Sequence, residues 1–146
     1  MNVVITLPKN LINSILSGAK RFEMRKNFPV SLHVGVEGFF VVEKGTNQIR
    51  CWCRVSYIHK LRLTSQMAVD YAPCLGVSPD YILNYQSLGE YVFLWAIDYV
   101  RPIFDTHLSA LGVSKNPQNY TYCLKTYGFA GNDKSANVAH VENLSE

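Results

Sequence analysis

The chain has 146 residues, 48% of them hydrophobic and 17% charged, which is the composition of one globular domain and excludes a disordered protein. Its net charge of +3 is unevenly divided, because residues 1–62 contain ten Lys or Arg and three Asp or Glu, whereas residues 63–146 contain four and eight. The balances of +7 and −4 predict one positive face, for which polyanions are the usual partners.

Neither a membrane protein nor a disulfide-stabilised protein is expected. No apolar run reaches the length of about 18 residues that a membrane span needs, and the opening "MNVVITLPKN" has no secretory leader. The four cysteines include no C-x-x-C pair, which argues for free thiols in a reducing compartment and against a zinc site. We therefore expect a cytoplasmic protein with no metal, no cofactor and no membrane partner.

The chain begins with a predicted strand and a predicted helix. The segment "NVVITL", residues 2–7, is rich in β-branched residues and favours a strand. Pro8 suits the first helical position, and Gly18 suits the position after a helix end. Between them, apolar residues fall on one helical stripe, made of Leu11, Ile12, Ile15 and Leu16.

The next segment, "KRFEMRK" at residues 20–26, alternates apolar and charged side chains. Period two predicts a strand with Phe22 and Met24 in the core and Glu23 on the opposite face. Pro29 ends this strand. Glu23 is the lone acid among four cations, which are Lys20, Arg21, Arg25 and Lys26.

Two further strands are predicted in the first half of the chain. "GFFVVEKG" at 38–45 is followed by a turn at 45–47 and then by "QIRCWCRVSYI" at 48–58. One face of the latter strand consists of Ile49, Cys51, Cys53, Val55 and Tyr57. The other face consists of Arg50, Trp52, Arg54 and Ser56.

The second half mixes helices and strands. Residues 64–88 have helical spacing, with a helix start at Ser78 before Pro79. The apolar run "EYVFLWAIDYV" predicts a strand buried on both sides. "DTHLSALG" predicts a short helix ended by Gly112, and "QNYTYCL" a last strand. The tail from Gly128 on is polar with weak periodicity, which predicts that it lies on the surface or is mobile.

These elements predict an α+β fold: a small curved sheet closing to a PUA-like β-barrel, with a helix after the first strand and an inserted helical segment. We expect one domain at residues 1–127 and a polar C-terminal tail at 128–146. The side chains expected to be buried on the sheet are Phe22, Met24, Val41, Cys51, Cys53, Val55, Phe93, Trp95 and Ile97.

Two stretches resemble the ASCH domain family of the PUA-like superfamily. "LINSILSGAKRFEMRKNFP" is similar to the family's L-x-G-x-K and x-x-E-x-R motif, and "VRPIFDTHLSALGVSKNPQNYTYC" to its ending. The resemblance covers residues 3–125. It implies the PUA-like barrel, a cleft beside the first helix and a role in RNA binding, with the family's charged positions at Lys20, Glu23 and Arg25.

The same resemblance implies an enzyme as the alternative. Some small relatives are amidohydrolases of acetylated cytidine that use a motif lysine, a threonine three residues later and a glutamate from the second half of the chain. Lys20 matches the lysine, but Glu23 stands at the threonine position, and no glutamate occurs between Glu43 and Glu90. Other relatives are reported as ribonucleases, so the candidate catalytic residues are Lys20 and Glu23.

Glu23 has two interpretations. As an ion-pair partner it allows Arg21 and Arg25 to share a strand face. As a binding residue it stays ionised between cations and accepts hydrogen bonds from the amino edge of a base, such as the exocyclic amine of cytosine. The surrounding cations, Lys20 and Lys26 included, would then hold phosphate or a carbonyl oxygen.

A second positive stripe follows on the next long strand. Arg50, Trp52 and Arg54 on one face would clamp a backbone and stack a base. The alternative is a tryptophan packed under a helix, with arginine stems over it. Lys60 and Arg62 continue the positive run.

The function that we expect is binding of RNA, single-stranded nucleic acid or a nucleotide-like ligand such as a modified nucleoside. The first alternative is a small hydrolase, either an amidohydrolase on an acylated nucleoside or a ribonuclease. The second is an accessory protein that binds another protein. An open basic groove favours binding, whereas a second acid or hydroxyl within reach of Lys20 favours the enzyme. An exposed apolar patch favours the protein partner.

Overall fold

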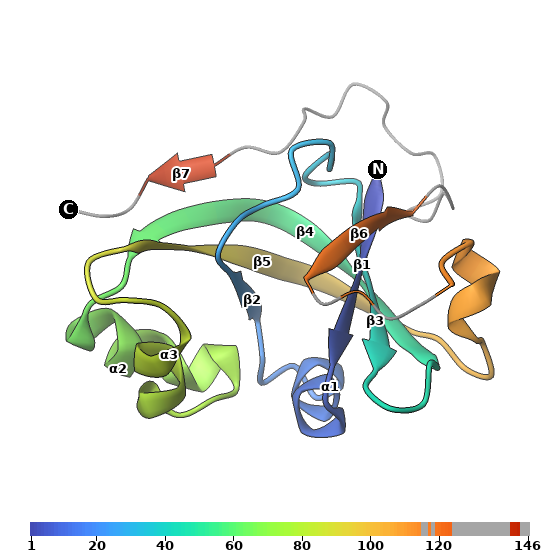
Figure 1. Cartoon of the computed structure of the whole chain (residues 1–146), viewed down its shortest axis with the longest axis horizontal. Helices are drawn as coiled ribbons and strands as arrows, with labels where there is room; N and C mark the ends of the chain where they lie inside the picture. Colours follow the sequence, from blue (N-terminus) through green and yellow to red (C-terminus); the bar gives the residue numbers. More distant parts are fainter. Residues whose placement is uncertain (115–116, 118, 124–140, 144–146) are drawn as a thin grey trace.

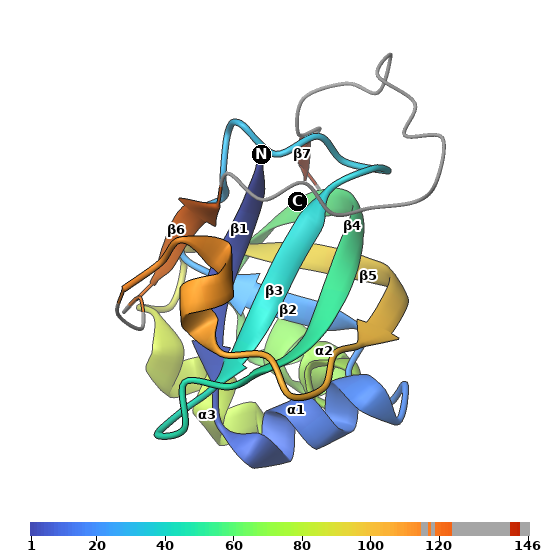
Figure 2. The ribbon, with the colours of Figure 1, turned by 90° about the vertical axis from the view of Figure 1, so that its right-hand side faces the viewer.

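The computed structural model describes residues 1–114, 117, 119–123 and 141–143. It has the predicted α+β composition, with one helix after the first strand and two helices inserted between the longest strands (Figures 1 and 2). In chain order the elements are β1 (Asn2–Leu7), α1 (Lys9–Leu16), β2 (Phe22–Arg25), β3 (Gly38–Glu43), β4 (Ile49–Arg62), α2 (Ser65–Leu75), α3 (Pro79–Tyr85), β5 (Tyr91–Pro102), the 3₁₀ helix η1 (Leu108–Leu111), β6 (Tyr120–Cys123) and β7 (Val141–Asn143).

The strands form one mixed sheet in the order β2-β5-β4-β3-β1-β6, and β7 pairs with β4 outside this path. The β1–β3 and β4–β7 pairs are parallel, and the other pairs are antiparallel. The register of β4 against β5 shifts between Arg54 and Tyr57. Such irregularities bend a strand and increase its twist, so the long β4–β5 pair curves across the molecule (Figure 1).

The barrel closure expected from the sequence is not seen in the described residues. The hydrogen-bonded path ends at β2 and β6, which do not pair with each other. These two edges meet instead at a seam: Arg25 Nη1 donates to the carbonyl oxygen of Asn119 over 3.1 Å, and the Tyr120 hydroxyl donates to that of Phe28 over 3.2 Å. Because Pro29 follows Phe28 and has no backbone N–H, it cannot continue a strand ladder there.

Three apolar clusters hold the elements together. The first lies between the sheet and α1 and includes Ile12 and Trp95. The second lies between α2, α3 and the sheet and includes Met24. The third lies under η1 and includes Trp52. Of the nine side chains predicted to be buried, six are buried and three are only partly buried, namely Phe22, Phe93 and Ile97.

Some sequence predictions need correction. Leu16, placed on the apolar stripe of the first helix, is 37% exposed because α1 ends there. The strand predicted at 90–100 is not buried along its whole length. Its buried residues lie between Val92 and Ala96, where Phe93 is only half-buried, and Asp98 is exposed. No strand was predicted in the polar tail, but Val141–Asn143 form one that pairs in parallel with Ile58–Lys60. The predicted domain boundary at 127 lies outside the described residues.

Two of the predicted helix ends are confirmed, whereas Pro8, predicted at the first helical position, lies one residue before α1 as its N-cap. The Ser78 hydroxyl accepts a hydrogen bond from the backbone N–H of Tyr81 at the start of α3. Gly112 has φ 74° at the end of η1, a left-handed conformation that glycine adopts without a steric penalty. The four cysteines are free thiols, and the Sγ atoms of Cys51 and Cys53 lie 4.0 Å apart. No helix in the described part of the chain is long and apolar enough to cross a membrane.

Candidate functional site

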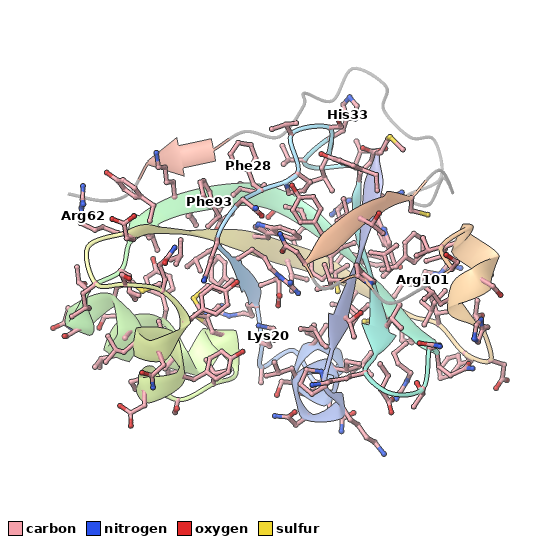
Figure 3. The ribbon with its side chains drawn as sticks, viewed as in Figure 1. Lys20, Phe28, His33, Arg62, Phe93 and Arg101 are labelled. Carbon is pink, nitrogen blue, oxygen red and sulfur yellow. The ribbon has the colours of Figure 1, made fainter. Side chains whose placement is uncertain are left out.

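A cleft of about 530 Å³ lies where α1, β1, β2 and the α2–α3 segment meet. Its size falls within the range of small-molecule binding sites. Figure 3 shows Lys20 at the junction of α1 and β2, on the side of the sheet where the helices lie. The residues that line the cleft are Thr6, Leu7, Pro8, Leu11, Lys20, Glu23, Met24, Arg25, Lys44, Leu75, Val77, Tyr81, Tyr85 and Pro117.

Lys20 is buried in the wall of this cleft, with only 4% of its surface exposed. Its Nζ donates to the carbonyl oxygens of Phe22 at 2.8 Å and Leu75 at 2.9 Å, and lies 3.3 Å from Glu23 Oε1. An ammonium group has three N–H bonds, so three acceptors use all of them. Lys20 therefore ties the segment before β2 to the last turn of α2.

Glu23 lies between Lys20 and Arg25, and it is also 4% exposed. Its Oε2 accepts from Arg25 Nε over 2.7 Å, while Oε1 faces Lys20. Glu23 and Arg25 are two residues apart on β2, so both side chains project to the same side of the strand. A carboxylate has about four acceptor positions, and within the described residues two of them are used.

Arg25 completes this arrangement at the seam between β2 and β6. Its Nε binds Glu23 and its Nη1 binds the Asn119 carbonyl oxygen, and no hydrogen bond from Nη2 is found among the described residues. Burying three charges is costly unless each is paired and hydrogen-bonded. The contacts explain how one acid is accommodated beside two cations, with an excess of one positive charge.

Two tyrosines from α3 form the opposite wall and were not assigned to the site from the sequence. Tyr81 is 52% exposed, whereas Tyr85 is half-buried. Burial raises the pKa of the Tyr85 hydroxyl, so this group remains a hydrogen-bond donor at neutral pH. Their i, i+4 spacing on one helix face was the available signal, but the sequence alone did not show what that face borders.

The wall of the cleft beside β1 and β3 also contains two polar residues that were not assigned to the site from the sequence. Thr6 comes from the end of β1, and Lys44 follows β3. Both lie at the same end of the sheet because β1 and β3 pair in parallel, with Thr6 opposite Val42 and Leu7 opposite Glu43. Nothing in the sequence around either residue indicated a site.

Two predicted site residues near Lys20 lie outside the lining of the cleft. Arg21 is exposed, and its backbone N–H binds the carbonyl oxygen of Cys74. Lys26 is also exposed, and its Nζ lies 5.4 Å from the centre of the Tyr85 ring. Lys26 is therefore at the rim, next to a residue of the cleft.

The second predicted stripe, Arg50-Trp52-Arg54, cannot act as a stacking surface. Trp52 has no exposed surface, and its Nε1 donates to Asn2 Oδ1 over 3.1 Å. The ring packs in the cluster under η1, so the prediction that it stacks on a base is wrong. Arg50 pairs with Glu43, and Arg54 makes two hydrogen bonds to Asp98 at 2.8 and 3.0 Å.

Lys60 and Arg62 gather around Tyr91 instead of the cleft. Their charged groups lie 4.3 and 4.6 Å from the centre of the Tyr91 ring, and Arg62 also binds the Tyr91 hydroxyl. Figure 3 shows Arg62 at the C-terminal end of β4, apart from Lys20. The predicted site residues thus divide into a buried group in the cleft and separate surface groups.

Comparison with known proteins identifies the fold. The sequence matches no protein-family model and no curated protein. The structure is similar to crystal structures of ASCH from Zymomonas mobilis. One point variant has 18% identity and a TM-score of 0.71, with 85% of this chain and 89% of that chain covered. The unmodified protein has 18% identity and a TM-score of 0.68, with 85% of this chain and 88% of that chain covered. Identity this low shows the fold alone.

Proposed function

We propose that this chain, which has the ASCH fold, binds RNA or a nucleotide-like ligand in the cleft around Lys20, Glu23 and Arg25. The resemblance of the L-x-G-x-K-x-x-E-x-R motif and the shared fold support this proposal together. Neither of them alone identifies a ligand, so the main support is the chemistry of the cleft.

The observation that carries the proposal is the environment of the Glu23 carboxylate, namely its ion pairs and its position in the lining of the cleft. This carboxylate is held by Lys20 and Arg25, lines the cleft and keeps acceptor positions unused among the described residues. A fixed carboxylate is a suitable acceptor for the exocyclic amine of a base. The remaining N–H groups of Arg25 suit a carbonyl or phosphate oxygen.

The aromatic wall fits the same ligand. The half-exposed ring of Tyr81 offers a face on which a base can stack, and stacking contributes roughly 1–3 kcal/mol per base in single-stranded complexes. Lys26 and Arg21 at or near the rim, and Lys60 and Arg62 at the far end of β4, would contact phosphates only.

The contacts of Lys20 favour binding over the hydrolase alternative. A lysine that acts as a general base needs a lone pair directed at the substrate. Here Nζ donates to two backbone carbonyls and faces Glu23, and no hydroxyl or second acid is among its contacts within the described residues. The protein-partner alternative has weaker support, since the large exposed hydrophobic side chains come from six separate segments: Leu16, Val30, Val69, Tyr81, Leu88 and Phe104.

Glu23→Gln tests the proposal, because the two interpretations of Glu23 predict opposite signs. If Glu23 only spaces charges, removing its charge tightens binding of every polyanion. If it accepts from a base, the variant loses roughly 1–3 kcal/mol for the preferred base. Binding of short single-stranded RNAs of different sequence, measured by fluorescence anisotropy at low salt, separates these outcomes.

Glu90→Gln is the matched control, since Glu90 is exposed, lies outside the lining of the cleft and loses the same charge. Thermal unfolding checks that Glu23→Gln remains folded. A folded Glu23→Gln variant that binds every RNA more tightly, or a wild-type protein that binds no RNA at low salt, contradicts the proposal.

A further inference from the structure

The β4–β5 pair extends past the strand that flanks its other half. β3 pairs with β4 only as far as Arg54, whereas β5 follows β4 to its end at Arg62. One face of this extension is buried under α2 and α3, where Leu61 and Val92 belong to the apolar cluster. Because side chains alternate along a strand, the residues between these two project to the other face.

That other face becomes less buried toward the end of the pair. Along β5, Trp95 has no exposed surface, Phe93 is half-buried, and Tyr91 is half-buried opposite the exposed Arg62. Phe28 is also half-buried, and its ring centre lies 5.1 Å from that of Phe93. Figure 3 shows Phe28 and Phe93 along this part of the pair and Arg62 at its end. Partly exposed aromatic rings are thus arranged on a rigid sheet.

This face is connected to the cleft through Arg25. The strand register places Phe93 directly between Arg25 on β2 and Lys60 on β4. Directly opposite residues on antiparallel strands project to the same face, with Cβ atoms about 4.5–5.5 Å apart. Arg25 lines the cleft, so two strand spacings, about 10 Å, separate a residue of the cleft from Lys60.

Tyr91 holds two cations at the end of this face. Lys60 Nζ and the Arg62 guanidinium lie 4.3 and 4.6 Å from the centre of its ring, and Arg62 Nη2 donates to its hydroxyl over 2.7 Å. Arg62 Nη1 also donates to the Gly89 carbonyl oxygen over 2.7 Å. Neither cation is paired with an acid in the described part of the chain. Fixed cations lose less conformational freedom when they bind an anion.

We propose that this face extends the cleft as an aromatic–basic strip, which makes the ligand a single-stranded RNA of several nucleotides and not a mononucleotide. The strip consists of Phe28, Phe93, Lys60, Tyr91 and Arg62. The inference rests on the proposed function. With one base in the cleft, the next bases stack on Phe28 and Phe93, and phosphates lie at Lys60 and Arg62, which Tyr91 positions. A duplex keeps its base faces stacked on each other and cannot use these rings.

The test measures how affinity depends on RNA length. Unlabelled oligoribonucleotides of one, two, four and eight residues, made of A, C, U or U with a single G, displace a fluorescent octamer from the wild-type protein. In at least one series, the tetramer should bind at least about tenfold more tightly than the mononucleotide, which is the scale of stacking one further base. A duplex octamer should bind more weakly than the single strand.

Phe93→Leu keeps an apolar side chain at this position and removes the ring. It should lose most of the gain in affinity with length and keep mononucleotide affinity within about twofold. Phe104→Leu is the matched control, because Phe104 is 77% exposed and follows β5 at the opposite end from Tyr91. It should keep the gain. Thermal unfolding checks that both variants are folded.

Two Tyr91 variants test the strip at a position outside the core. Tyr91→Phe keeps the ring that holds both cations and should retain most of the gain with length. Tyr91→Leu removes the ring and should lose most of it. If Lys60 and Arg62 act only through their charge, the two variants bind equally, because neither substitution changes the charge.

Four results overturn the strip. They are affinity that does not rise with length, including no binding at any length, a duplex that binds as tightly as the single strand, equal effects of Phe93→Leu and Phe104→Leu, and equal effects of Tyr91→Phe and Tyr91→Leu. In each case, binding of a nucleotide or an RNA that depends on Glu23 would still support the proposed function. If wild type binds neither, the proposed function itself fails.

Discussion

Lys20 Nζ donates to the carbonyl oxygen of Leu75 over 2.9 Å, across 55 positions of sequence. Leu75 is the last residue of α2, and Gly76 after it has φ 73°, a left-handed conformation that ends the helix. The charged motif is thereby fixed to the inserted helices, and Lys20 supports the position of the wall of the cleft that carries Tyr81 and Tyr85. This role predicts an effect on stability as well as on binding.

Lys20→Met should therefore destabilise the fold. It leaves the Phe22 and Leu75 carbonyls without this donor and leaves Glu23 with one cation fewer, and loss of one partner of a buried pair costs about 3–5 kcal/mol. Urea unfolding measures the change. Lys9→Met, at an exposed position, should stay within about 0.5 kcal/mol of wild type. Equal stabilities of the two variants would show that the Lys20 hydrogen bonds contribute nothing.

Trp52→Phe should lower stability and leave RNA binding unchanged. The variant loses the hydrogen bond to Asn2 and part of the packing under η1, which we expect to cost about 1–3 kcal/mol. Because Trp52 has no exposed surface, it has no ring face for a base. RNA affinity of the folded variant that falls more than tenfold would contradict the burial of Trp52.

Affinity for single-stranded RNA should fall steeply as salt rises, because each phosphate neutralised by Lys or Arg releases condensed counterion. Lys60→Ala and Arg62→Ala should weaken binding about equally for all sequences and reduce the salt slope by about 0.7 for each phosphate that is no longer neutralised. Anisotropy titrations at several salt concentrations give both quantities. A change in sequence preference in either variant would place these residues against bases and not phosphates.

Cys74 should be the first cysteine to react with a thiol reagent in the native protein. It is half-buried, whereas the other three thiols are buried. Burial raises the pKa of Cys53 well above its usual value, and a protonated, inaccessible thiol is unreactive. Burial also raises the pKa of Cys74, so its reaction should still be slower than that of a free thiol. Intact-mass analysis of wild type and Cys74→Ser follows the first addition, and an equally fast first addition in Cys74→Ser would contradict this order.

The sequence by itself determined the features that depend on neighbouring residues. Alternation identified β2, and the proximity of Lys20, Glu23 and Arg25 follows from their spacing within one short segment. The start of α3 at Ser78 and the end of η1 at Gly112 were predicted for the same reason, since each residue acts within one turn of itself.

Only the tertiary structure decided what covers each face. Trp52 and Glu23 both lie on strand faces that sequence patterns marked as polar, yet both are buried, one under η1 and the other at the back of a cleft. Tyr81, Thr6 and Lys44 line the cleft from α3, β1 and the turn after β3. In the described residues the sheet remains open at the seam, where side chains of β2 and β6 donate to backbone carbonyls beside the other strand and form no ladder. These outcomes depend on contacts between residues far apart in the chain, whereas periodicity records only the direction in which a side chain leaves its own backbone.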